Sequence, residues 1–112
     1  MTTNKELVEK FTVGERSGHS GTMHIESFCA KENGLVRTLL YSYATPIAMR
    51  GFAPCGDLFY IIVNKKFSQT TARHLALLKE NTVFIESFVR RLVQPDKFKE
   101  YLENQHISTG RL

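Results

Sequence analysis

Basic and hydroxyl side chains are concentrated in residues 65–74 of this 112-residue sequence. Hydroxyls and free backbone N–H groups at the start of a helix attract anions, and cations beside them could hold a phosphate. The alternative is an ordinary helix cap, in which Ser68 or Thr70 bonds to the first turn and the lysines are solvated. The candidate anion-binding or nucleic-acid-binding residues of this stretch are Lys65, Lys66, Ser68, Thr70, Thr71 and Arg73.

The excess positive charge of the chain lies in its middle third. The formal net charge is +4, and residues 35–74 carry five basic groups against Asp57 alone. Arg37 and Arg50 therefore join the candidate anion-binding residues. A local basic surface attracts nucleic acid, phosphorylated small molecules or acidic protein faces, and charge alone does not choose among them. Whether these residues form one surface depends on the fold.

His74, Tyr41 and Tyr43 are the other candidates for chemistry or binding. A histidine can carry protons near neutral pH or make a structural hydrogen bond. We favour the structural role, because no Ser, Cys or carboxylate partner stands at a recognised motif spacing. Tyr41 and Tyr43 would share one face of a strand, where they could stack on bases. Packing is the more common role for such tyrosines, and the glycine-aromatic motifs of single-strand readers are absent.

The cysteines and histidines do not form a recognisable metal site. Cys29 and Cys55 are expected to be reduced, half-buried thiols of an intracellular protein. His19, His24 and Cys29 are spaced at intervals of five, which fits none of the close paired spacings of structural zinc sites. No phosphate-binding Gly-Lys-Ser/Thr loop follows the glycines. We therefore expect no catalytic residue, no metal and no cofactor.

Apolar periodicity and turn residues predict how these residues are positioned. Thr3 and Glu6 are typical of a capping box at a helix start. Asn33-Gly34 predicts a two-residue hairpin turn between antiparallel strands, and Pro46 predicts a bulge or step before the next strand. The predicted strands lie at about 23–30, 35–43, 47–52 and 58–63, and the predicted helices at about 3–11, 71–79, 85–92 and from 95 onward.

The third of these helices has a competing interpretation. A strand at Val83–Phe88 fits the same apolar stretch, because short apolar runs agree with both periodicities. We also expect the tail from His106 to Leu112 to be frayed. The helix is favoured by apolar residues at i, i+3, i+4 and i+7, namely Ile85, Phe88, Val89 and Leu92.

Two motifs stand on either side of the strand that precedes the basic stretch. Residues 40–48 read Leu-Tyr-Ser-Tyr-Ala-Thr-Pro-Ile-Ala, and residues 66–74 read Lys-Phe-Ser-Gln-Thr-Thr-Ala-Arg-His. In this order they resemble an uncharacterised family of small phage- and plasmid-encoded proteins with a Ser-Tyr-x-Thr-x-Ile/Val-Ala strand and a Tyr/Phe-Ser-x-Thr-Thr-x-Arg/Lys-His helix start. The insert at residues 52–57 departs from that pattern. The resemblance implies a mobile-element origin and says little about chemistry.

The whole chain, residues 1–112, is expected to be one α+β domain. A hydrophobic content of 42% is enough for a packed core. The expected architecture is a small antiparallel sheet of about four strands, covered on one face by two or three helices. No segment reaches the length of a signal peptide or a membrane span. We therefore expect a soluble protein of the host-cell cytoplasm.

Two functions suit a small basic protein of this kind, and neither is enzymatic. The first is a phage or mobile-element accessory protein that binds nucleic acid through the basic segment. The second is an anti-CRISPR-like inhibitor that binds a protein effector of a host defence system. Phosphate contacts weaken steeply as salt rises, whereas a packed protein interface depends on salt less. The oligomeric state is left open, a homodimer included.

Overall fold

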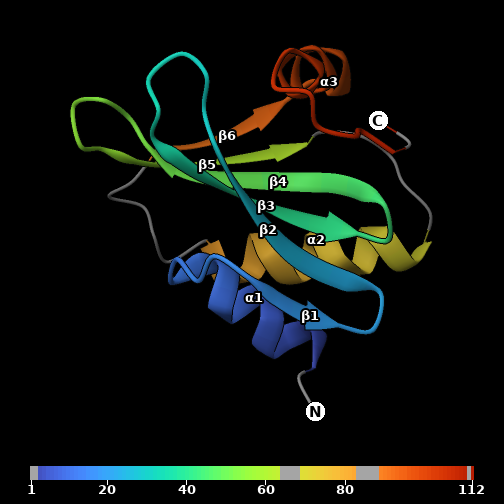
Figure 1. The fold of residues 1–112 in the computed structure, drawn as a ribbon. Coiled ribbons are helices and arrows are strands. Elements are labelled where there is room, and N and C mark those ends of the chain that lie inside the picture. Colours follow the sequence, from blue (N-terminus) through green and yellow to red (C-terminus); the bar gives the residue numbers. More distant parts are fainter. Residues whose placement is uncertain (1–2, 64–68, 83–88, 111) are drawn as a thin grey trace.

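Three helices pack against one mixed sheet in the described part of the chain (Figure 1). The computed structural model describes residues 3–63, 69–82, 89–110 and 112. The α+β class expected from the sequence is confirmed. In chain order the elements are α1 (Asn4–Thr12), β1 (Gly18–Ser20), β2 (Met23–Cys29), β3 (Val36–Ser42), β4 (Thr45–Phe52), β5 (Leu58–Val63), α2 (Gln69–Thr82), β6 (Val89–Val93) and α3 (Pro95–Asn104).

The six strands of the described residues lie across the sheet in chain order. Neighbours from β1 to β5 are antiparallel. β6 instead pairs in parallel with β5, with Phe59 opposite Val89 and Val63 opposite Val93. A parallel pair needs a crossover connection, and α2 lies in it. The sheet is therefore larger than expected and has one parallel edge.

β6 lies where the sequence predicted the end of a helix at residues 85–92, so that prediction is wrong for its last turn. Val89 and Leu92 fit the helical spacing, but so short an apolar run also fits a strand. Pairing with β5, which lies 30 positions earlier in the register, decides between the two, and no local pattern reveals it. The competing strand at Val83–Phe88 lies outside the described residues.

Thr3 begins α1 in the way its spacing to Glu6 predicts. Its Oγ1 accepts a hydrogen bond from the Glu6 backbone N–H at 3.1 Å and donates one to the Glu6 carboxylate at 3.2 Å. Leu7, Val8 and Phe11 follow at helical spacing, and all three are buried. The cap and this apolar stripe fix α1 against the sheet.

The β2–β3 connection joins antiparallel strands as expected, but its turn is longer than two residues. The Ala30 N–H donates to the Leu35 carbonyl at 2.9 Å, and the Gly34 N–H donates to the Ala30 carbonyl at 2.7 Å. Gly34 has a φ of 72°, a conformation that glycine adopts without a steric penalty. The Asn-Gly pair thus marked the right place, whereas the loop length was wrong.

Pro46 lies beside a bulge, as its place in the sequence predicts. Leu40 pairs with Ala48 and Tyr41 pairs with Pro46, so Ile47 is an extra residue on β4. Both Ile47 and Ala48 consequently join the same apolar core. β4 begins at Thr45, two residues before the expected start.

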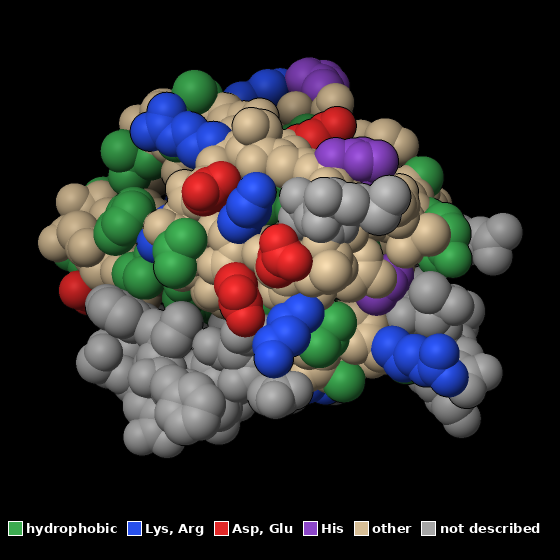
Figure 2. Space-filling view, turned by 90° about the horizontal axis from the view of Figure 1, so that it is seen from below, with side chains coloured by type: hydrophobic (Ala, Val, Ile, Leu, Met, Phe, Trp, Pro, Cys, Tyr) green, Lys and Arg blue, Asp and Glu red, His purple; other side chains and the backbone are tan. Residues whose placement is uncertain are grey.

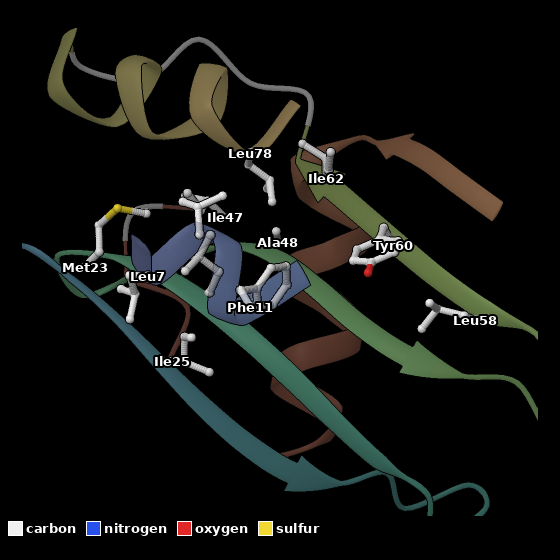
Figure 3. Close-up of a cluster of buried hydrophobic side chains, with 12 residues drawn as sticks. Leu7, Phe11, Met23, Ile25, Ile47, Ala48, Leu58, Tyr60, Ile62 and Leu78 are labelled. Carbon is white, nitrogen blue, oxygen red and sulfur yellow. The ribbon is translucent and has the colours of Figure 1, made fainter. Parts of the chain in front are cut away.

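One apolar core lies between the sheet and the helices α1 and α2. Leu7 and Phe11 of α1 and Leu78 of α2 point toward Ile47 and Tyr60 of the sheet (Figure 3). The Phe11 and Tyr60 rings meet edge to face, with centroids 6.4 Å apart. Two helices therefore cover this face, as the sequence predicted.

A second core lies on the opposite face of the sheet, under α3 (Figure 1). Phe98 and Leu102 of α3 pack there with Leu39 and Met49. Helices thus cover both faces, whereas the sequence was expected to place them on one. The tail expected to be frayed also contributes to this core, through Ile107 and Leu112.

α2 begins two residues before and ends three residues after the helix predicted at 71–79. It has 14 residues. Within the described part of the chain, no helix has both the length and the apolar character needed to cross a membrane.

Candidate functional site

His74 and Ser42 bring the two sequence motifs into contact. Ser42 is the last residue of β3, and His74 lies in the second turn of α2. The Ser42 Oγ lies 2.7 Å from the His74 Nδ1, and the two residues are 1% and 2% exposed. The strand motif and the helix motif therefore meet at a buried hydrogen bond.

Asn4 and Ser20 complete the polar surroundings of His74. The Asn4 Nδ2 lies 3.2 Å from the His74 Nε2, and the Ser20 hydroxyl donates to the Asn4 Oδ1 at 2.9 Å. Thr22 lies close as well, with its Oγ1 3.4 Å from the same ring nitrogen. We name these five residues, Asn4, Ser20, Thr22, Ser42 and His74, the His74 cluster. It joins α1, the β1–β2 turn, β3 and α2 at one point.

The hydrogen bonds of the His74 cluster define the tautomer of the ring. An amide nitrogen can only donate, so the His74 Nε2 accepts from Asn4, and the proton of the neutral ring is on Nδ1. That proton is donated to the Ser42 Oγ. Burial lowers the pKa of His74, which keeps the ring neutral at pH 7. In this state the ring has no lone pair facing Ser42 with which to take its proton, and the arrangement is that of a structural hydrogen bond.

Arg73 is the one basic residue of the 65–74 stretch whose side chain the structure describes, and it is exposed. Its neighbour His74 is buried, so the two side chains leave α2 in different directions. Thr70 and Thr71 lie in the first turn of α2, but their side chains are not among those described. Outside the described residues lie Lys65, Lys66 and Ser68.

Arg37 lies on the α3 face of the sheet and is 9% exposed. Its guanidinium carbon is 4.7 Å from the centroid of the Phe59 ring and 6.0 Å from that of Tyr101. One of its terminal nitrogens is 3.4 Å from the Glu32 carboxylate. Arg37 is therefore held among aromatic rings rather than directed into solvent.

Arg50 lies on the opposite face, because it pairs with Thr38, the neighbour of Arg37 on β3. The Arg50 Nε donates to the Tyr60 Oη at 3.2 Å, and the Tyr60 hydroxyl donates to the Thr12 carbonyl at 2.6 Å. The sheet thus separates the two arginines that the sequence grouped together. On the face seen in Figure 2, the described Lys and Arg side chains are also interspersed with Asp and Glu.

Tyr41 and Tyr43 do not form a stacking pair. Tyr41 is 5% exposed, and its ring stacks on that of His24 with centroids 4.4 Å apart. Burial, followed by the Glu26 charge, raises the pKa of Tyr41 to about 12. Tyr43 instead occupies the β3–β4 turn with a φ of 57° and is 54% exposed. The turn separates the two rings, which were expected on one strand face.

Cys29 and Cys55 are both free and exposed, whereas the sequence was expected to bury them in part. The Cys55 thiol donates to the Asp57 carboxylate at 3.4 Å. No group of three or more His, Cys, Asp or Glu residues that could hold a metal ion occurs in residues 3–63, 69–82 or 89–110.

Sequence reasoning missed Asn4, Ser20 and Thr22 as partners of His74. Asn4 and His74 are 70 positions apart, and no local pattern connects them. Asn4 follows the helix cap and resembles any polar residue of a first turn. The only available signal was the pair of motifs that contain Ser42 and His74.

Comparison with known proteins gives a family and no chemistry. No curated protein and no solved structure matches the chain. One family model matches residues 2–91, which include both motifs, the whole His74 cluster and both arginines. The chain belongs to the family described as a family of unknown function (DUF8033).

Proposed function

We propose that this protein is a mobile-element accessory protein that binds nucleic acid through the start of α2. The observation that carries the proposal is the exposed Arg73 beside the buried His74. His74 fixes the first turns of α2 to β3 through Ser42, and Arg73 consequently extends into solvent from a fixed point. A cation held in this way can contact a phosphate with little loss of conformational entropy.

The charges around Arg73 support the same proposal. The first turn of α2 contains no acidic residue, so nothing in it opposes an anion. Lys65 and Lys66 precede that turn in the sequence. Arg37 is excluded from this surface because it lies on the α3 face of the sheet. Arg50 lies on the face that α1 and α2 cover, but its guanidinium is held beside the Tyr60 and Phe52 rings. The proposed surface is therefore smaller than the segment that the sequence singled out.

The proposal is tested by measuring the binding of labelled single- and double-stranded DNA and RNA by fluorescence anisotropy across a salt series. The variant replaces Lys65, Lys66 and Arg73 with Ala, and Arg16→Ala serves as the control because Arg16 is exposed and lies outside the segment. Each lost phosphate contact should lower the slope of log affinity against log salt by about 0.7 to 0.9. Binding by the triple variant that equals the binding by Arg16→Ala would refute the proposal.

A protein surface is the second candidate target, and one exposed apolar patch favours it. Val13 is 74% exposed and Phe52 is 47% exposed. Arg50 lies near Phe52, with its guanidinium carbon 5.5 Å from the Phe52 ring centroid, and its terminal nitrogen lies beside Gly14, the residue after Val13. Arginine and aromatic residues are enriched at the energetic centres of protein interfaces. An inhibitor of a host defence effector would use this patch.

The two candidates differ in which substitution removes binding. Phe52→Ser changes the apolar patch and leaves the α2 surface intact, whereas the triple variant does the reverse. Capture of a defence effector from nuclease-treated host lysate should be lost in Phe52→Ser if the protein is an inhibitor. Capture that needs intact nucleic acid and is lost in the triple variant favours the first proposal instead.

A further inference from the structure

Tyr43 places an exposed aromatic side chain in a turn whose conformation disfavours it. Ser42 pairs with Thr45, so Tyr43 and Ala44 form a two-residue loop between β3 and β4. Tyr43 has a φ of 57°, in the left-handed region that Gly, Asn or Asp usually occupies in such loops. Residues held in such conformations cluster at functional sites. More than half of Tyr43 is exposed, so its side chain is accessible to a ligand.

Hydrogen bonds and packing hold this turn in one place. The Tyr43 N–H donates to the Thr22 carbonyl at 2.6 Å, which joins the turn to the β1–β2 turn. Ser42, the preceding residue, is bonded to His74 of α2. The C-terminal segment also lies against the turn, since a Cβ on Gly110 would collide with its backbone. An aromatic residue on a backbone fixed in this way loses little conformational entropy when it binds a ligand.

Exposed residues next to the His74 cluster share one end of the molecule. In Figure 1 the start of α1, the β3–β4 turn and the start of α2 lie at the same end of the sheet. The His74 ring joins the three segments through its contacts with Asn4 and Ser42. The exposed sequence neighbours of these three residues are Lys5, Tyr43 and Arg73. One aromatic side chain and two cations are therefore held within one residue of the same buried cluster.

Cations together with an exposed aromatic ring are the combination by which proteins bind single-stranded nucleic acid. The cations contact the phosphates, and an unpaired base stacks on the ring. Glu6 is the acidic residue in the first turn of α1, and its carboxylate already accepts a hydrogen bond from Thr3. The first turn of α2 contains no acidic residue. This end of the molecule therefore suits a strand with unpaired bases better than a duplex, whose bases are stacked on one another.

We propose that Tyr43 stacks on an unpaired base of single-stranded DNA or RNA while Arg73 and Lys5 contact neighbouring phosphates. This inference rests on the proposed function and names its substrate class. Tyr41 takes no part, since it is buried and its ring stacks on His24. Every base has a face on which a ring can stack, so binding should depend little on sequence.

The test compares the binding of labelled single strands of one sequence, as DNA and as RNA, with that of the matching duplexes by fluorescence anisotropy. The wild-type chain should bind at least one of the single strands about tenfold more tightly than its duplex, and the tighter strand identifies the natural sugar. Tyr43→Ala should weaken single-strand binding by about 5- to 150-fold and leave the salt slope unchanged, because no phosphate contact is lost. Alanine keeps the Cβ, so the turn bears the same backbone cost. Tyr43→Phe should bind as the wild type does.

A lysine pair tests the phosphate contact independently of the ring. Lys5→Gln should lower the slope of log affinity against log salt by about 0.7 for single strands. Lys10→Gln is the matched control, because Lys10 lies in the last turn of the same helix, and it should leave the slope unchanged. Equal slopes for the two variants would remove Lys5 from the proposed surface.

Tryptophan fluorescence tests the stacking directly, because the chain contains no tryptophan. The emission of Tyr43→Trp should be quenched by single strands. Phe52→Trp is the control, since Phe52 is also exposed and lies roughly 20 Å away at the other end of β4. Single-strand binding that is equal in Tyr43→Ala and the wild type, or Tyr43→Trp emission that single strands leave unchanged, overturns the stacking inference. The proposed function survives that result if the triple variant still loses binding, whereas binding to none of the four nucleic acids overturns both.

Discussion

Ser42 and His74 are separated by 32 positions in the sequence and joined by a 2.7 Å hydrogen bond that lies beneath the surface. Ser42 ends the strand of the first motif, and His74 ends the helix start of the second. Each residue supplies the hydrogen-bond partner that the other needs, so both polar side chains can be buried among apolar core residues. It also makes the join between β3 and α2 sensitive to single substitutions.

Ser42→Ala should destabilise the protein by about 1 to 3 kcal/mol, since it leaves the His74 Nδ1–H buried without its acceptor. Urea unfolding followed by circular dichroism measures this free energy. Ser17→Ala is the control, because Ser17 is exposed and surface substitutions usually change stability by less than about 0.5 kcal/mol. Equal stabilities of the two variants would contradict the structural role assigned to the bond.

The stability of the protein should fall as the pH drops below the unfolded-state pKa of His74, for which 6.5 is the reference value. Burial lowers the folded-state pKa of His74, so in that range the unfolded chain binds more protons than the folded one. The contribution is complete above pH 6.5 and is lost as the pH falls toward the lowered folded pKa. His74→Gln should remove this component of the pH dependence, whereas the exposed His19→Gln should retain it. Thermal melts across pH 5 to 8, about the range of histidine titration, provide the comparison.

Tyr101→Phe should weaken the hydrogen bonds that join Glu32 of the β2–β3 loop to Tyr101 and Gln105, without unfolding α3. The lost hydrogen bond to Glu32 predicts a destabilisation of about 0.5 to 1.5 kcal/mol. Amide hydrogen exchange should quicken in α3 and the β2–β3 loop and stay unchanged in α1. Tyr43→Phe removes the same hydroxyl from an exposed turn residue and should have little effect. If amide hydrogen exchange in α3 is the same in Tyr101→Phe as in the wild type, the hydrogen bond to Glu32 does not stabilise the helix.

Gly110→Ala should release the C-terminal segment from the β3–β4 turn. Gly110 has a φ of 52°, and a Cβ there would collide with the Ala44 carbonyl oxygen and the Thr45 Oγ1. Gly34→Ala is the matched control, because Gly34 has a φ of 72° but nothing within 4 Å of its Cβ position. The control should lose only the conformational term of about 1 to 2 kcal/mol. Methyl NMR signals of Ile107 and Leu112 should become solvent-averaged in Gly110→Ala and remain dispersed in Gly34→Ala.

The parts of the fold that could be predicted from the sequence are those determined locally. The Thr3 cap, the Pro46 bulge and the start of α3 at Pro95 each depend on residues a few positions apart. β6 was missed because its pairing with a distant strand outweighs its helical spacing. The helix α3 was predicted, but its position on the second face was missed, because local alternation does not reveal that β3 is buried on both sides.

The candidate site followed the same division. The two motifs contain Ser42 and His74, but only His74 was named as a candidate, and nothing in the sequence indicated that the two residues touch. The charge count grouped Arg37 with Arg50, since a sum over sequence carries no information about the two sides of a sheet. The burial of Arg37 among the Phe59 and Tyr101 rings results from packing between elements far apart in the chain.

The burial of β3 on both faces raises the question of what determines its alignment with its neighbours. Every residue from Arg37 to Ser42 is buried. In the middle of the strand, a shift of one position would exchange Leu39, Leu40 and Tyr41 for one another between the two faces, and hydrophobicity there would select weakly against it. The polar residues at the ends of the strand select the correct register. A shifted strand would turn Ser42 away from His74 and Arg37 away from Glu32, and would leave both charged or polar groups buried without partners. The polar residues at the two ends of β3 thus determine its register. A variant in which both Arg37 and Ser42 are replaced by apolar residues should populate states with a shifted register of β3 during folding.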